Sequence, residues 1–167
     1  GAARLTVGEF LRRWLAGREG ELAPRTVAGQ RNIIERYLAP VIGHLRLREV
    51  APSDVQEVIL RAREKGAQQG TIRNVHSVLR RAFREAVEMG LMADNPCDRA
   101  RPGRYRPRQP QLPPLEQLVE LLRVADGTPV GPMVRLAAAT GMREGELLGL
   151  KWGDVDEERG VLRVQRS

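Results

Sequence analysis

A proline-rich stretch near the middle of the chain limits what this sequence can fold into. Residues 97–114 contain five prolines and five arginines. Proline fixes its own φ angle and has no N–H group, so a stretch this rich in proline favours an extended, semi-rigid chain. We therefore expect an interdomain linker here. It would divide the 167 residues into a domain at residues 1–96 and a second unit at residues 115–167.

The first domain has the sequence pattern of a compact bundle of four helices. Apolar residues recur at helical spacing in four runs, which are separated by breaks rich in glycine and proline. Thr6 and Glu9 form a capping box at the start of the first helix. Pro40, which cannot continue the hydrogen-bond ladder, and Gly43 are expected to end the second helix. The later helices are expected at Pro24 to about Leu38, from Pro52 onward, and at about Thr71–Met89.

The second unit mixes helical patterns with one strand pattern. The helices are expected at about Leu115–Val124, Pro132–Ala139 and Arg143–Leu150. After a turn at Asp156–Gly160, residues 161–164 alternate as a strand would. A single strand is not stable without partners. The predicted fold class is therefore mainly α, with a truncated α+β unit after the linker.

The composition excludes several kinds of protein. Hydrophobic residues make up 41% of the chain, enough for a core, yet no window approaches the roughly 18–20 apolar residues of a membrane span. The single cysteine, Cys97, rules out an intrachain disulfide and a cysteine-only metal site. His44 and His76 are too far apart in sequence to indicate zinc. We expect a cytoplasmic protein that holds no metal and contacts no membrane.

The charge is positive and unevenly distributed. The net charge of +7 divides into +5 over residues 1–96, +4 over residues 97–114 and −2 over residues 115–167. Of the basic residues, 26 are arginine and two are lysine. A GC-rich coding sequence explains this bias equally well as selection for arginine, whose planar fork binds phosphate bidentately. The asymmetry along the chain indicates a polyanionic partner.

Three places in the sequence are suited to contact with double-stranded DNA. The polar face of the fourth helix offers asparagine and arginine, which read base edges, and serine and arginine, which hold phosphates. The start of the second helix offers backbone amides that attract phosphate, and the linker arginines can follow the DNA backbone. A solvated charged face is the alternative interpretation of the fourth helix. The candidates are Arg25, Thr26, Arg73, Asn74, Ser77, Arg80, Arg81, Arg84, Arg104, Arg106 and Arg108.

The stretch from Ala139 to Val155 resembles the first signature of the tyrosine recombinases, the phage integrase family. That signature reads Thr-Gly-x-Arg-x-x-Glu-Leu, followed by a short apolar run and a Trp-x-Asp-hydrophobic close. The segments at 24–27, 52–55, 71–86, 90–91 and 95–96 are similar to the helical core-binding domain of the same integrases. The signature matches at Thr140, Gly141, Arg143, Glu146, Leu147, Leu150, Trp152, Asp154 and Val155.

This resemblance implies a four-helix, SAM-like core-binding bundle followed by the beginning of a recombinase catalytic domain. Members of the family are encoded by bacteria and phages, and assemble as tetramers on DNA. They cut and rejoin DNA through a 3′-phosphotyrosyl intermediate without a metal or a nucleotide cofactor. By resemblance, Arg143 is the first catalytic arginine, which clamps the scissile phosphate. Glu146 is either its supporting carboxylate or an ordinary surface partner three residues along the helix.

The other catalytic groups of the family have no counterpart in these residues. Neither His44 nor His76 begins a His-x-x-Arg motif, and Lys151 does not match the catalytic lysine. Tyr37 belongs to an apolar helix stripe, and Tyr105 precedes the signature, so neither fits the nucleophile. We therefore expect this chain to bind DNA without cleaving it.

Two other functions remain open from the sequence. The chain could be a non-enzymatic DNA-binding protein derived from an integrase. It could also be a basic helical module that binds proteins, in which case its affinity for DNA would not depend steeply on salt.

Overall fold

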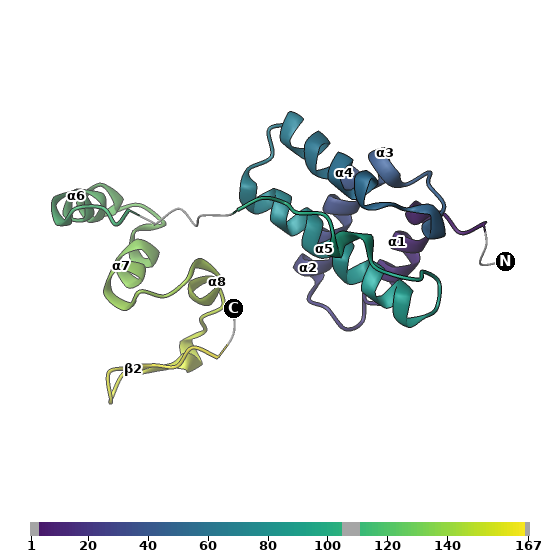
Figure 1. Cartoon of the computed structure of the whole chain (residues 1–167). Coiled ribbons are helices and arrows are strands. Elements are labelled where there is room, and N and C mark those ends of the chain that lie inside the picture. The colour runs from purple at the N-terminus through teal and green to yellow at the C-terminus, as the bar shows by residue number, and fades with distance from the viewer. Residues whose placement is uncertain (1–3, 105–110, 166–167) are drawn as a thin grey trace. The chain divides into compact units, whose positions relative to one another are not determined.

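The computed structural model describes residues 4–104 and 111–165. The chain forms two compact units, residues 1–107 and residues 108–167. In Figure 1 the first unit holds the helices α1–α5 and the second holds α6–α8 and a small β-hairpin. The mainly helical fold predicted from the sequence is confirmed.

The described part of unit 1 is a bundle of helices around one apolar core. Its largest buried side chains include Leu11, Leu38, Leu79 and Phe83, which come from three different helices or turns. The elements in chain order are α1 (Val7–Ala16), α2 (Pro24–Ile33), the π-helical turn η2 (Ile34–Leu38), α3 (Ala39–Ile42), the 3₁₀ turn η3 (Leu47–Glu49), α4 (Pro52–Glu64), α5 (Gln69–Glu88) and the 3₁₀ turn η4 (Pro96–Asp98).

The predicted capping box at the start of α1 is present. The Thr6 N–H donates to the Glu9 carboxylate at 3.0 Å, and the Glu9 N–H donates to the Thr6 hydroxyl at 3.3 Å. These bonds satisfy two backbone donors that the first helical turn leaves open. The hydrogen bonds from Thr6 lower the pKa of Glu9.

The helical chain continues past Pro40 to Ile42, so the predicted end is wrong at Pro40 and is confirmed at Gly43, which caps α3. The chain passes from α2 through η2 into α3 without leaving helical geometry, and Pro40 lies in the first turn of α3. A missing N–H is tolerated there, because the N–H groups in the first turn of a helix have no acceptor within that helix. In a continuous α-helix the Arg36 carbonyl would accept from residue 40. It accepts instead from the Lys65 ammonium, at 2.9 Å.

Unit 2 has the predicted helices and a hairpin in place of a single strand. Val155 pairs with Leu162 and Asp156 with Val161, so the strand predicted at 161–164 has an antiparallel partner. Among its described residues only Ala125, Gly131 and Asp154 are buried. The elements are α6 (Leu115–Ala125), α7 (Gly131–Thr140), α8 (Glu144–Leu148), the 3₁₀ turn η5 (Trp152–Asp154), β1 (Val155–Asp156) and β2 (Val161–Leu162).

The contact between Lys65 and the Arg36 carbonyl gives a test of the fold. Lys65→Met should lower the free energy of unfolding of unit 1 by about 1 kcal/mol, because it leaves the Arg36 carbonyl without its donor. Arg48→Met, which removes an exposed cation from η3, should change it by less than about 0.5 kcal/mol. Urea unfolding followed by the fluorescence of buried Trp14, with Trp152 replaced by Phe, measures both values. Equal effects of the two variants would contradict this account.

Candidate nucleic-acid interface

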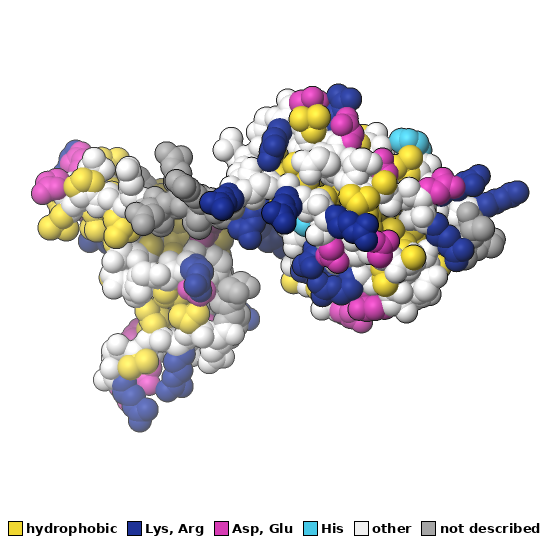
Figure 2. Space-filling model, viewed as in Figure 1, with side chains coloured by type: hydrophobic (Ala, Val, Ile, Leu, Met, Phe, Trp, Pro, Cys, Tyr) yellow, Lys and Arg dark blue, Asp and Glu magenta, His cyan; other side chains and the backbone are white. Residues whose placement is uncertain are grey.

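The polar face of α5 presents all six residues predicted on it to solvent. Ile72, Val75, Leu79 and Phe83 point into the core, and the opposite side of the helix therefore stays outside. Spacings of three, four and seven residues place the predicted set on one face of the helix. In Figure 2, Lys and Arg side chains gather over the part of unit 1 where α5 lies. The exposed residues of the set are Arg73, Asn74, Ser77, Arg80, Arg81 and Arg84.

Two ion pairs affect the charge of this helix. Arg80 Nε donates to Asp98 Oδ1 at 2.7 Å, so a phosphate would have to compete with Asp98 for this guanidinium. Glu85 is paired with Arg18, whose guanidinium also lies over the Trp14 ring at 5.1 Å from its centroid. Because Arg18 neutralises Glu85, this carboxylate opposes an anionic ligand less than an unpaired carboxylate would.

The start of α2 keeps the features that attract an anion. Arg25 and Thr26 are exposed, and Pro24 occupies the first helical position. Ala23, which precedes α2, supplies no side-chain cap, and the first turn contains no acidic residue. The partial positive charge of the helix terminus is therefore not offset locally. α2 packs against α5 within unit 1.

Part of the arginine-rich stretch lies within the described residues. Arg104 is exposed, whereas Arg106 and Arg108 lie outside the described residues. The start of the stretch, which the sequence assigned to the linker, packs on unit 1. Cys97 and Ala100 are buried, and His76 Nε2 lies 3.0 Å from the Cys97 carbonyl oxygen. The sequence candidates omitted Arg101, which is also exposed; its place in the same arginine-rich stretch was the available signal.

Arg143 and Glu146 meet at the start of α8. Arg143 is the residue that caps α8, one position before the helix and not inside its first turn as predicted. Glu146 accepts the Arg143 backbone N–H at 2.8 Å and the Arg143 guanidinium at 3.0 Å. These bonds, the backbone one first, lower the pKa of Glu146. Glu146 is therefore held as an anion that orients Arg143, whose own side chain is 87% exposed.

The residues before Arg143 give the chain its turn between α7 and α8. Gly141 has φ +68°, a left-handed conformation that glycine adopts without strain, and its N–H closes α7 on the Ala137 carbonyl at 2.9 Å. The Thr140 hydroxyl donates to the Leu136 carbonyl at 2.6 Å and accepts the Met142 N–H at 3.3 Å. Thr140 and Gly141 thus end α7, and the exposed Arg143 follows them at the start of α8.

The close of the signature has a structural role in the described part of unit 2. Asp154 is buried, and its carboxylate accepts the Lys151 N–H at 2.9 Å. The Asp154 carbonyl accepts the Arg163 N–H at 2.9 Å. Asp154 therefore connects η5 to the hairpin, while Trp152 is 88% exposed.

Other reactive groups are absent from the described residues or are buried. No group of three His, Cys, Asp or Glu side chains in residues 4–104 and 111–165 could hold a metal ion. Burial raises the pKa of the Cys97 thiol to about 12, so it stays protonated and unreactive. Tyr37 is buried in the core, as predicted, and Tyr105 lies outside the described residues. In the same residues, the helices are too short or too polar to cross a bilayer.

Comparison with known proteins agrees with these features. Residues 7–102 match the family model of the phage integrase central domain. An integrase of Saccharopolyspora erythraea is 28% identical over 162 residues, which cover 93% of this chain and 37% of that protein. The chain thus spans well under half the length of that relative.

Two solved structures have a similar fold. The Tn1549 transposon integrase in complex with circular intermediate DNA has a TM-score of 0.78 and 26% identity, over 96% of this chain and 54% of that one. A lambda integrase tetramer bound to a Holliday junction has a TM-score of 0.79 and 20% identity, over 92% of this chain and 44% of that one. The second likeness concerns the fold alone.

The central-domain match covers more than half of the chain, and it lies on the helical bundle whose α5 carries the basic face. The arginine–glutamate pair of the recombinase signature follows it at the start of α8. The chain belongs to the phage integrase family of tyrosine recombinases.

Proposed function

We propose that this chain is the DNA-binding domain and the first part of the catalytic domain of a site-specific DNA recombinase. The observation that carries the proposal is the arrangement of Arg143, an exposed guanidinium held by Glu146 at the start of α8. Residues 1–96 would bind double-stranded DNA, residues 97–114 would connect the domains, and residues 115–167 would begin the catalytic domain. The protein would act in the cytoplasm of a bacterium.

The basic face of α5 is the proposed main contact with the duplex. Its arginines and Asn74 can reach base edges and phosphates, while Ser77 is short enough to bring the helix close to the backbone. Arg25 and Thr26 at the start of α2 add a phosphate contact. Arg104 continues the positive charge along the chain that follows. The proposed DNA contacts all lie before residue 115, and so does the excess of positive charge.

Arg143 is the proposed phosphate clamp of the chemical step. Glu146 fixes the guanidinium from one side, so that the remaining N–H groups stay available for the non-bridging oxygens of the scissile phosphate. Positive charge held there in advance stabilises the extra negative charge of the transition state. In the full recombinase a tyrosine hydroxyl would attack the phosphorus and form a 3′-phosphotyrosyl bond, and the 5′-hydroxyl of the cut strand would leave.

The complete enzyme would work as a tetramer on DNA, as the resemblance to the tyrosine recombinases implies. The 167 residues include no tyrosine that fits the nucleophile, because Tyr37 is buried and Tyr105 precedes Arg143 in the chain. We therefore propose that this chain binds DNA and does not cleave it.

Removing arginines from α5 should weaken DNA binding in a salt-dependent way. The unmodified chain should show a steep negative slope of log affinity against log salt, measured by fluorescence anisotropy with a labelled mixed-sequence duplex. Arg81→Ala and Arg84→Ala should each weaken binding by roughly tenfold and reduce the slope by about 0.9, the value for one phosphate contact.

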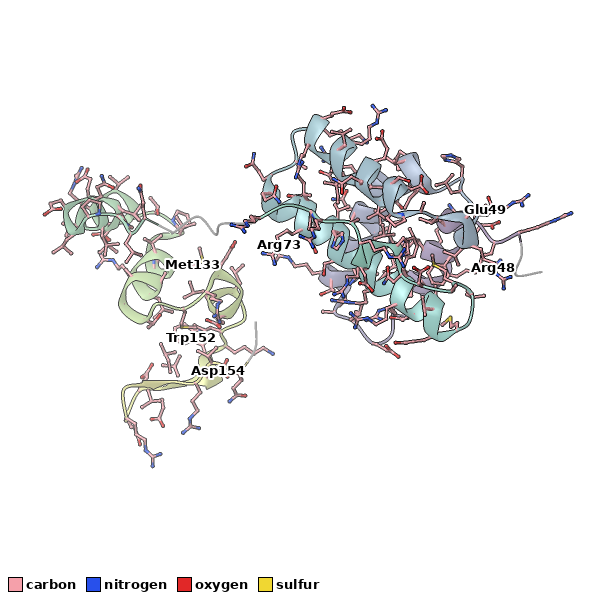
Figure 3. All side chains as sticks on the ribbon, in the orientation of Figure 1. Arg48, Glu49, Arg73, Met133, Trp152 and Asp154 are labelled. Atoms are coloured by element: carbon pink, nitrogen blue, oxygen red, sulfur yellow. The ribbon has the colours of Figure 1, made fainter. Side chains whose placement is uncertain are left out.

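Arg48→Ala is the matched control for these variants. Arg48 is exposed, and Figure 3 shows it at the opposite end of unit 1 from Arg73 of α5. It should leave affinity and slope nearly unchanged. A flat slope for the unmodified chain would reject DNA binding and favour a module that binds proteins.

The chain should form no covalent adduct with DNA. A suicide substrate with a nick beside the scissile phosphate traps a phosphotyrosyl intermediate, because the short cut strand diffuses away. Denaturing electrophoresis should show free DNA only, even at concentrations where anisotropy shows full binding. A shifted band that protease treatment removes would place a nucleophile in this chain and contradict the proposal.

Arg143 should be needed for cleavage and not for binding. In a longer form of the protein that carries the remaining catalytic residues, Arg143→Ala should slow cleavage by about 10²- to 10³-fold. Its affinity for DNA should change little, because unit 1 supplies most of the contacts. Arg135→Ala, which removes an exposed arginine from α7 that pairs with Asp126, is the control and should cleave at the normal rate. Equal losses in both variants would argue against the clamp.

A further inference from the structure

Two side chains of unit 1 hold one carbonyl of the arginine-rich stretch. Gln69 Nε2 donates to the Pro102 carbonyl oxygen at 2.6 Å, and Arg63 Nη2 donates to the same oxygen at 3.1 Å. Arg63 lies in the last turn of α4 and Gln69 in the first turn of α5. A carbonyl oxygen has two lone pairs, so it can accept both bonds at once. We call these two hydrogen bonds the clasp. They connect the end of α4 and the start of α5 to Pro102, which lies 39 residues after Arg63 and 33 residues after Gln69.

The residue after Pro102 is a glycine in a conformation that favours glycine. Gly103 has φ +91°, a conformation that other residues rarely adopt. A Cβ atom at this position would lie 3.0 Å from Arg63 Nη2 and 3.2 Å from Gln69 Nε2. The backbone thus approaches both clasp residues so closely that a side chain would push them apart.

The stretch before the clasp is fixed as well. Cys97 and Ala100 are buried in unit 1, and His76 of α5 contacts the Cys97 carbonyl. Asn95 donates to the Arg80 carbonyl at 2.9 Å. The chain therefore stays attached to α5 from residue 95 to the clasp at Pro102.

Two exposed arginines flank the clasped carbonyl. Arg101 and Arg104 lie on either side of Pro102 and Gly103, and neither forms an ion pair with another residue in the described part of the chain. Arg99, by contrast, pairs with Asp94 at 3.2 Å. The clasp thus fixes the backbone between Arg101 and Arg104, next to the first turn of α5.

We propose that Arg63 and Gln69 are positioning residues that hold Arg101 and Arg104 in place for the DNA backbone. The proposal rests on the DNA binding proposed above and adds to it how the arginines of the chain leaving unit 1 are directed. Ordering a backbone segment in advance removes an entropic cost from binding. Without the clasp, Arg101 and Arg104 would have to be ordered when DNA binds, and they would neutralise phosphates less completely.

Gln69→Leu tests this directly, because glutamine carries no charge. The variant removes the shorter of the two hydrogen bonds to the Pro102 carbonyl and removes no cation, so it can change the salt slope only by its effect on other residues. Binding to a labelled mixed-sequence duplex should weaken roughly three- to tenfold, and the slope should fall by about 1 to 2. Gln68→Leu is the matched control. Gln68 is the exposed neighbour whose side chain makes no capping bond to α5, and its replacement should leave the slope unchanged.

A double-mutant cycle separates positioning from direct contact. In the background Arg101→Gln with Arg104→Gln, Gln69→Leu should have no further effect on affinity or slope, because the residues on which it acts are gone. Gly103→Ala should reproduce the loss seen for Gln69→Leu in the unmodified background, which guards against a folding artefact at position 69. Circular dichroism should show the same helix content in all variants.

The outcomes distinguish this proposal from the proposed function. A steep slope that Gln69→Leu leaves unchanged would overturn the clasp and keep DNA binding. An effect of Gln69→Leu that persists in full in the double-arginine background would show that Gln69 touches DNA itself, and would also overturn the clasp. A flat slope in the unmodified chain would reject DNA binding and the clasp proposal with it.

Discussion

The burial of one face of α5 is the constraint on which the rest of unit 1 depends. Val75, Leu79, Ala82, Phe83 and Ala86 have no measurable exposure, so this helix is fixed in rotation as well as in position. A helix that cannot rotate must present its opposite face to solvent. The core packing therefore also displays the arginines proposed to bind DNA. The same helix anchors the following chain through contacts of Arg80, His76 and Gln69.

Four helices or turns in the described residues carry at their third position an acidic residue whose carboxylate caps the start of the helix. Glu9, Asp54, Glu146 and Asp154 each accept the backbone N–H of the residue three positions earlier, at 2.8–3.0 Å. At three of these sites the bond serves the fold. At Glu146 it also brings the carboxylate against the guanidinium of Arg143. The pairing with Arg143 that both interpretations of Glu146 require is therefore present, and the same carboxylate caps α8.

Local patterns in the sequence predicted most of the helices and both residues of the Arg143–Glu146 pair. They failed at Pro40, which does not end a helix, and they did not indicate that the start of the arginine-rich stretch packs on unit 1. In the first case Lys65 supplies the donor that Pro40 lacks. In the second, apolar Cys97 and Ala100 are buried. Both failures involve a partner far away in sequence, which propensities and spacing do not represent.

The sequence by itself determined the elements, the uneven charge and the family signature, because helix periodicity, capping and motif spacing act within a few residues. Only the tertiary structure decided which charged groups are paired and where the arginine-rich stretch leaves unit 1. Arg18 with Glu85, Lys65 with Arg36, and Gln69 with Pro102 join residues 67, 29 and 33 positions apart. Such pairs form only after packing has brought the helices together, since the core fixes which surfaces meet.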